Sequence, residues 1–127
     1  MSELATFWTE RHLCTVTTVR RDGTLHTVPV GATYDPETGI ARIITSGRSQ
    51  KVRNVEHNAR ISICQVDGRR WSTLEGEAVI SRSPQDVLDA EQRYARRYKQ
   101  PRENPERVVI VVTVTRVLGT YRPDRLR

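Results

Sequence analysis

Several residue types are scarce in this chain, and each scarcity excludes a class of protein. The only two cysteines, Cys14 and Cys64, lie in apolar strand-like runs and predict buried thiols rather than a disulfide framework. The three histidines have no regular spacing with cysteines or carboxylates, so we expect no metal site. Aromatic residues make up 6% of the chain and form no stacking motif, which argues against a nucleic-acid-binding module.

Long apolar runs are also missing. No run approaches the roughly 20 residues that span a bilayer, and the N-terminus lacks the basic-then-apolar pattern of a signal peptide. We therefore expect a cytoplasmic protein with no membrane partner. A length of 127 residues leaves room for one domain, residues 1–127. The hydrophobic content of 36% is modest for an independent core, and an obligate dimer would help to explain it.

Positive charge is in excess, with a net charge of +6 and a local concentration of basic residues from Arg93 to Arg107. A solvated helix face followed by a basic loop explains this pattern, and an acidic small-molecule ligand would also suit it. Nucleic acid is the weaker interpretation. The sequence favours exposure to solvent for the helix residues Arg93, Arg96 and Arg97, and also for Gln65 at the end of a strand.

Turn and cap residues divide the chain into short elements. Helices are predicted from Ser2 to about residue 12, from Ser49 to about residue 58, and from Ser83-Pro84 to about residue 99. Strands are predicted over 13–19, 25–34, 40–45, 60–66, 70–81 and 108–117. Pro29 has no N–H for a sheet and indicates a bulge or an edge position. Six strands joined mostly by short turns predict a mainly β, antiparallel, closed or partly closed barrel with helices at its ends.

The segment from Ile43 to Gln65 carries the strongest functional signal. An apolar strand ends in Thr45, Ser46 and Gly47, and a basic helix begins at Ser49. The N–H groups and the dipole of a helix start favour an anion. We therefore predict that a phosphorylated ligand binds between Thr45 and Lys51, with Lys51 as the principal contact. An exposed lysine, a serine that only caps the helix and an ordinary turn are the alternatives.

The Thr-Ser-Gly-x-Ser-Gln-Lys run and the predicted architecture together resemble the pyridoxamine 5'-phosphate oxidase-like split β-barrel superfamily. Within it, the chain is similar to the flavin/deazaflavin oxidoreductases that use coenzyme F-420. The similarity covers nearly the whole sequence. Further matching segments are Thr9-Glu10-Arg11-His12-Leu13, Cys64-Gln65-Val66-Asp67-Gly68, Arg70-Trp71, Leu74-Glu75-Gly76 and Val117-Leu118-Gly119.

This resemblance implies a split β-barrel homodimer with two cofactor sites at the subunit interface. The implied reaction is hydride transfer from reduced F-420 to a conjugated acceptor such as a tetrapyrrole, with biliverdin giving bilirubin as the best candidate. An FMN-dependent enzyme of the same fold and a non-catalytic flavin- or tetrapyrrole-binding protein are the alternatives. The acidic oligoglutamate tail of F-420 would give the basic residues a partner, with Arg48, Lys51 and Arg53 as candidates.

The candidate cofactor-binding residues lie on three segments of the chain. The second strand is implied to contact the cofactor ring, the strand-to-helix turn to hold the phosphate, and Trp71 to line the interface. The sequence identifies no catalytic residue and no proton donor. For His26 an outward-facing position, and for Trp71 ordinary packing, are open alternatives. The candidates are His26, Thr27, Val28, Pro29, Ile44, Thr45, Ser46, Gly47, Arg48, Ser49, Gln50, Lys51 and Trp71.

Overall fold

The computed structural model describes residues 2–121. In this part of the chain, seven antiparallel strands form one sheet in the order β2-β1-β5-β6-β7-β4-β3. The strands are β1 (Cys14–Val19), β2 (Leu25–Val30), β3 (Ala32–Asp35), β4 (Ile40–Ser46), β5 (Arg60–Asp67), β6 (Arg70–Ser81) and β7 (Arg107–Gly119). The helices are α1 (Glu3–Thr9), α2 (Gln50–His57) and α3 (Pro84–Arg97). The mainly β, antiparallel architecture predicted from the sequence is confirmed.

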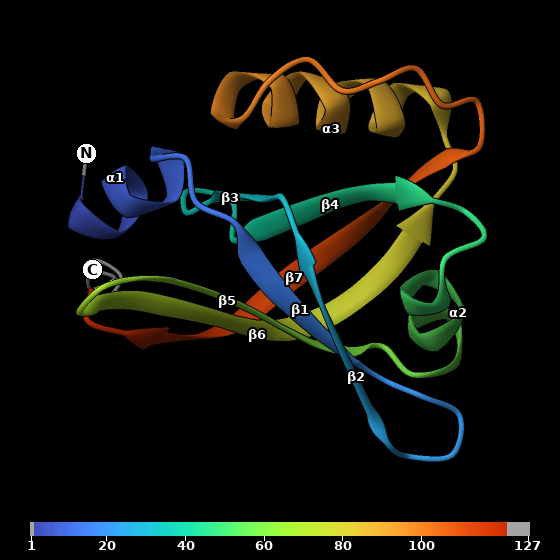
Figure 1. Ribbon diagram of the computed structural model, residues 1–127, viewed down its shortest axis with the longest axis horizontal. Coiled ribbons are helices and arrows are strands. Elements are labelled where there is room, and N and C mark those ends of the chain that lie inside the picture. The colour runs from blue at the N-terminus through green and yellow to red at the C-terminus, as the bar shows by residue number, and fades with distance from the viewer. Residues whose placement is uncertain (1, 122–127) are drawn as a thin grey trace.

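The sheet curls into a half-barrel because its two edge strands are consecutive in the chain (Figure 1). Only Gly31 separates β2, which pairs with β1, from β3, which pairs with β4. The prediction of a single strand over 25–34 is therefore wrong. A Cβ atom at Gly31 would lie 2.8 Å from Cε2 of Tyr94, so glycine allows this change of partner beside α3. The predicted edge position of Pro29 is confirmed.

The strands alternate between a buried inner face and an outer face, as the period of two requires. Side chains that are at most 1% exposed line the inner face, among them Val16, Ile43, Ile63, Leu74 and Ile110. Helices α1 and α2 lie at opposite ends of the half-barrel (Figure 1) and bury apolar residues, Leu4, Phe7 and Trp8 from α1 and Val52 and Val55 from α2. Helix α1 ends at Thr9, three residues earlier than predicted.

Helix α3 covers part of the outer face, where Asp89 pairs with Arg42 of β4 at 3.5 Å. Its predicted start is confirmed, because the Ser83 side chain accepts a hydrogen bond from the backbone N–H of Asp86. No described element covers the outer face of β2, β1, β5 and β6. Cys64 lies on this face and is only half-buried, so burial is confirmed for Cys14 alone. None of the described helices is long and apolar enough to cross a membrane.

A buried polar cluster at the α1 end contradicts two predictions of exposure. Arg97 is 7% exposed and Gln65 is 1% exposed. The guanidinium of Arg97 donates to the carbonyl oxygens of Glu10 (2.8 Å) and Ala32 (2.6 Å) and to Oε1 of Gln65 (2.5 Å). The last turn of α3 packs over the link between α1 and β1, and this contact between distant parts of the chain buries the Arg97 side chain.

Candidate functional site

Helix α2 begins at the end of β4, as the sequence predicts, but its start is not capped by a side chain. Ser49 has the extended N-cap conformation, yet its hydroxyl makes no capping hydrogen bond. Instead, the Ser49 Oγ accepts a hydrogen bond of 3.3 Å from the Thr45 hydroxyl. The N–H of Gly47 is engaged with the carbonyl of Glu106 at 2.9 Å. The N–H groups of the first turn are therefore available to an anion.

Lys51 lies in the first turn of α2 and is half-buried. It makes no hydrogen bond or ion pair with any described residue, and burial lowers the pKa of its amine. Its two basic neighbours are engaged. Arg48, which is 84% exposed, pairs with Glu106 at 2.7 Å, and Arg53 donates to Oε1 of Gln50 at 2.8 Å. Lys51 is thus a partly desolvated cation without an anionic partner in residues 2–121, the arrangement that an anionic ligand would satisfy.

His26 brings β2 into the same region. Its place in the alternation puts its side chain on the inner face with Val28 and Val30, so an outward-facing position is wrong. Burial, together with the charges of Arg20 and Lys51, lowers the pKa of the imidazole. Its Nδ1 atom is buried and has no hydrogen-bond partner in the described part of the chain. His26 and Lys51 therefore converge from two separate elements.

A side-chain network fixes α2 against the sheet beneath this site. The buried Asn54 donates from Nδ2 to Oγ1 of Thr18 at 3.0 Å, and Thr18 is the cross-strand partner of His26. Gln50 donates from Nε2 to Oδ1 of Asn54 at 2.7 Å. The side chain of Gln50 thus contacts its own helix and positions Asn54. Its backbone N–H lies in the first turn of α2.

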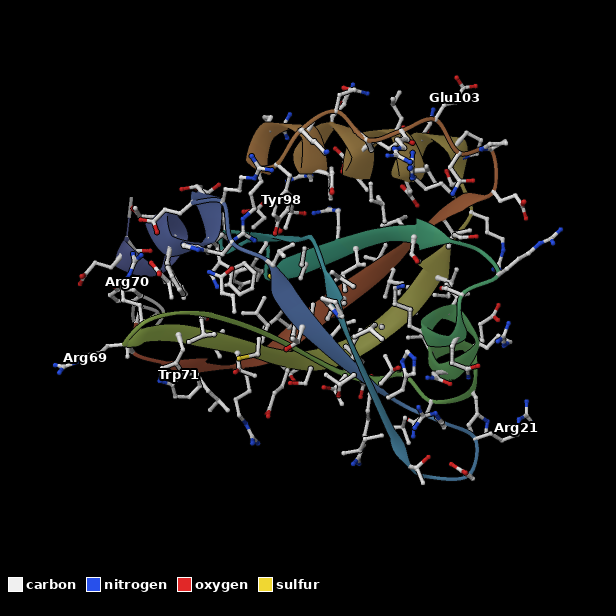
Figure 2. The ribbon with its side chains drawn as sticks, in the orientation of Figure 1. Arg21, Arg69, Arg70, Trp71, Tyr98 and Glu103 are labelled. Atoms are coloured by element: carbon white, nitrogen blue, oxygen red, sulfur yellow. The ribbon has the colours of Figure 1, made fainter. Side chains whose placement is uncertain are left out.

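The other candidates are not all brought together in one chain. Val28 faces inward with His26, whereas Thr27 and Pro29 face outward, and Thr27 shares a 2.9 Å hydroxyl hydrogen bond with Thr17. Ile44 also faces outward, opposite Val109 in the sheet. Trp71 lies at the far end of the sheet from Arg21, which marks the α2 end (Figure 2). Within a single subunit, Trp71 therefore does not join Thr45 and Lys51.

The sequence analysis missed basic residues of the β1–β2 hairpin. Arg21 and Arg53, with Glu56 and His57, line a hollow of about 350 Å³ between this hairpin and α2. The signal was present, because Arg20-Arg21 directly precedes the Asp22-Gly23 turn. Only the packing of the hairpin beside α2 could show that Arg21 lies near Arg53.

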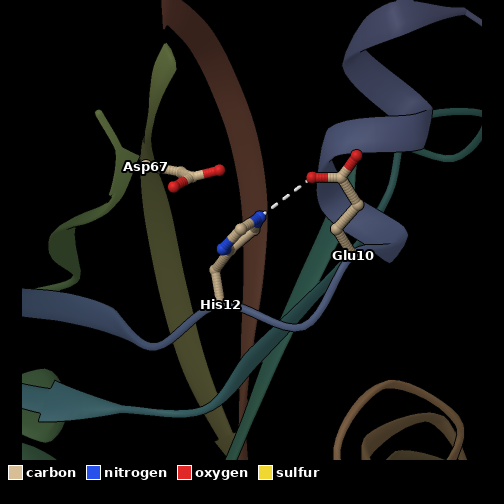
Figure 3. A group of neighbouring side chains, drawn as sticks. All are labelled: Glu10, His12 and Asp67. Atoms are coloured by element: carbon tan, nitrogen blue, oxygen red, sulfur yellow. Dashed lines mark hydrogen bonds and ion pairs between the residues drawn. The ribbon is translucent and has the colours of Figure 1, made fainter. Parts of the chain in front are cut away.

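A second group of polar side chains forms at the α1 end, where Glu10, His12 and Asp67 converge (Figure 3). Oε1 of Glu10 lies 3.0 Å from Nε2 of His12, and this contact, followed by Arg70, lowers the pKa of the Glu10 carboxyl. Arg70 also donates to Glu10 at 2.9 Å and to Asp67. The guanidinium of Arg70 already neutralises both carboxylates. The group is therefore better explained as a set of ion pairs that connects the α1–β1 link to the β5–β6 hairpin than as a metal site.

Comparisons with known proteins agree with this architecture. The pyridoxamine 5'-phosphate oxidase family matches residues 1–121. A coenzyme F-420-dependent biliverdin reductase of Mycobacterium tuberculosis is 52% identical over 114 residues, which are 90% of this chain and 83% of that protein.

Solved structures resemble the fold. One described as an F-420 reductase has a TM-score of 0.71 at 23% identity, over 89% of this chain and 94% of its own. A conserved hypothetical protein of Mycobacterium tuberculosis has a TM-score of 0.78 at 24% identity, over 94% of this chain and 84% of its own. At these identities the two structures show a shared fold and nothing further.

Proposed function

The chain belongs to the pyridoxamine 5'-phosphate oxidase family, and we propose that it is a coenzyme F-420-dependent reductase with biliverdin as its substrate and bilirubin as its product. The observation that carries the proposal is the uncapped start of α2, where Lys51 has no anionic partner among the described residues. The 52% identity to an F-420-dependent biliverdin reductase over 90% of this chain supports the choice of cofactor and substrate.

The residues present fit the phosphate of such a cofactor. The first-turn N–H groups of α2, the Thr45 and Ser49 hydroxyls and the Lys51 amine would hold it, and the buried Nδ1 of His26 offers a further contact. When bound, the deazaflavin supplies hydride chemistry. The protein's part is to fix the ring against the acceptor and to limit access of water. Charge-assisted hydrogen bonds to the phosphate contribute about 1.5–3 kcal/mol each.

The hollow between the hairpin and α2 suits the acidic tail of F-420. Arg21 and Arg53 line it, and Glu56, its one acidic lining residue, is paired with Arg82 at 3.1 Å. We therefore place the tail along Arg53 and Arg21. Arg48, bound to Glu106, is a weaker candidate than the sequence suggested. These exposed cations would contribute on the order of 0–1 kcal/mol each.

A homodimer is part of the proposal. The uncovered outer face carries the exposed apolar side chains Leu25, Val66 and Val79, at 65%, 63% and 64% exposure, and Trp71 at 39%. Burial of such a face against a second copy would offset the modest core and would let Trp71 approach the partner's cofactor site. Light scattering after size-exclusion chromatography tests this proposal, and a wild-type monomer at micromolar concentration would contradict the homodimer. A cytoplasmic location stays a prediction.

An FMN-dependent oxidoreductase is the second candidate, since the family to which the chain belongs is that of pyridoxamine 5'-phosphate oxidase. The phosphate-binding groups at Thr45 to Lys51 suit either cofactor. A non-catalytic flavin- or tetrapyrrole-binding protein is the third, and cofactor turnover would exclude it.

The test compares F-420 with FMN in side-by-side titrations and then mixes the reduced F-420 complex with biliverdin. We expect tighter binding of F-420 and loss of the biliverdin absorbance. Lys51→Ala should weaken F-420 about 10- to 100-fold. Lys99→Ala, which removes the chain's other lysine two residues beyond α3, is the matched control and should bind normally. Preference for FMN would overturn the assignment, and F-420 binding without turnover would overturn the substrate.

A further inference from the structure

The imidazole of His26 has an unusual environment for a histidine at a strand end. Its Nδ1 is buried without a hydrogen-bond partner in the described residues. A buried ring nitrogen needs an acceptor when it carries a proton and a donor when it does not, and a missing partner costs about 1–3 kcal/mol. The fold therefore holds a polar atom that is satisfied in neither protonation state. At a ligand site, an oxygen of the ligand can supply this partner.

The charges around this ring are positive. Arg20, at the end of β1, donates from Nη1 to the carbonyl of Leu25 at 2.6 Å, which anchors its guanidinium beside β2. Lys51 approaches from α2, and the cross-strand neighbour Thr18 is uncharged. The carboxylates of the adjoining elements are engaged elsewhere: Asp22 accepts from the backbone N–H and the hydroxyl of Thr24. Glu56 on α2 pairs with Arg82.

These surroundings disfavour a third positive charge on the ring, and the pKa of His26 is accordingly lowered, first by burial and then by Arg20 and Lys51. An anionic oxygen beside Nδ1 reverses both effects. It supplies the missing acceptor and offsets the two cations, so the protonated ring becomes the favoured form.

We propose that binding of the cofactor's phosphate is coupled to uptake of one proton from the buffered solution by His26, whose Nδ1–H then donates to an anionic oxygen of the ligand. The proposal rests on the proposed function, because it concerns the same site. It assigns His26 the role of a pH-dependent cofactor contact beside Lys51. Since the complex binds more protons than the free protein, affinity rises as pH falls through the pKa of His26 in the complex.

Two measurements test the coupling. Isothermal titration calorimetry of F-420 near pH 6.5, in phosphate-free buffers of different ionisation enthalpy, gives the number of protons taken up. NMR titration of the imidazole signals gives the pKa directly, and the three histidines of the chain make assignment by substitution practical. We expect F-420 to raise the pKa of His26. For each unit of increase, affinity at acidic pH should exceed affinity at alkaline pH by about tenfold.

His26→Gln should abolish the proton uptake and flatten the dependence of affinity on pH. His12→Gln is the matched control, because His12 lies at the opposite end of the half-barrel beside Glu10, and it should retain the uptake. Binding of F-420 without proton uptake, or uptake that persists in His26→Gln, would overturn the coupling while leaving the proposed function intact.

Failure of F-420 to bind at all would overturn the proposed function and with it the cofactor-linked form of the coupling. A titration with inorganic phosphate, followed by the same NMR signals, then decides separately whether an anion raises the pKa of His26. An unmoved His26 signal at saturating phosphate would remove the residue from any anion site.

Discussion

Arg97→Met tests whether the buried polar cluster holds the α1 end of the half-barrel closed. Methionine approximates the length of the side chain but removes three charge-assisted hydrogen bonds. The carbonyl of Ala32 keeps only a shared donor, because the Tyr98 hydroxyl, 3.0 Å away, has a single proton and also lies 2.7 Å from the His12 carbonyl. The carbonyl of Glu10 has no other donor among the described residues, and Oε1 of Gln65 retains only the weak thiol of Cys14 at 3.6 Å.

Two acceptors, the part-buried Glu10 carbonyl and the buried Oε1 of Gln65, therefore lose their strong donor, at about 1–3 kcal/mol each. The guanidinium also stacks over Trp8, with its central carbon 4.9 Å from the ring centroid, and such a contact contributes about 0.5–2 kcal/mol. Release from the desolvation of a buried charge opposes these losses. We expect Arg97→Met to lower the free energy of unfolding by about 2–6 kcal/mol, a range set by the two unsatisfied acceptors.

Urea unfolding followed by tryptophan fluorescence measures this change. Arg96→Met, one position earlier and exposed, is the matched control and should stay within about 0.5 kcal/mol of wild type. Gln65→Leu combined with Arg97→Met removes both partners of the shortest contact, so the double variant should lose less than the sum of the single losses. Equal stability of Arg97→Met and Arg96→Met would refute the reasoning.

Two further substitutions test other parts of the fold. Gly31→Ala should destabilise the protein by about 1–3 kcal/mol, because the added Cβ would lie 2.8 Å from Tyr94; an unchanged melting temperature would show that the ring moves aside. Glu10 has a lowered pKa in the folded state, so the stability it contributes is present above its ordinary pKa and is lost as pH falls through the folded pKa. Glu10→Gln should therefore reduce the loss of unfolding free energy that wild type shows as the pH is lowered. An unchanged dependence on acidic pH would show that Glu10 does not cause this loss.

Local signals in the sequence were sufficient for most of the fold. Asp-Gly turns, the Ser2 and Ser83 caps and alternating strands placed three helices and most strands, because each depends on neighbours within a few residues. The division of the segment 25–34 into β2 and β3 could not be predicted from neighbouring residues. It depends on the contact between Gly31 and Tyr94 of α3, which lies far along the chain. A glycine within a strand pattern often marks the close approach of another segment of the chain, and Gly31 fits that pattern.

Side chains that interact over long separations were the least predictable. Gln65 and Arg97 look like surface residues in any local window, because each satisfies the other only after α3 has packed on the half-barrel. The helix start at Ser49 was predictable because its elements adjoin in sequence. The convergence of His26 with Lys51 was not, since it requires the hairpin register that pairs Thr18 with His26 and the docking of α2 through Asn54.

The α2 end of the half-barrel combines features that cost stability when no ligand is bound. The helix start is uncapped, Lys51 is partly desolvated without a described partner, and His26 has an unsatisfied nitrogen. At the α1 end, by contrast, the buried cation Arg97 has an acceptor for each of its three donating nitrogens. A fold that satisfies its polar groups at one end and leaves them unsatisfied at the other indicates that the second end is organised for an anion. The contrast supports a ligand at α2 independently of any sequence similarity.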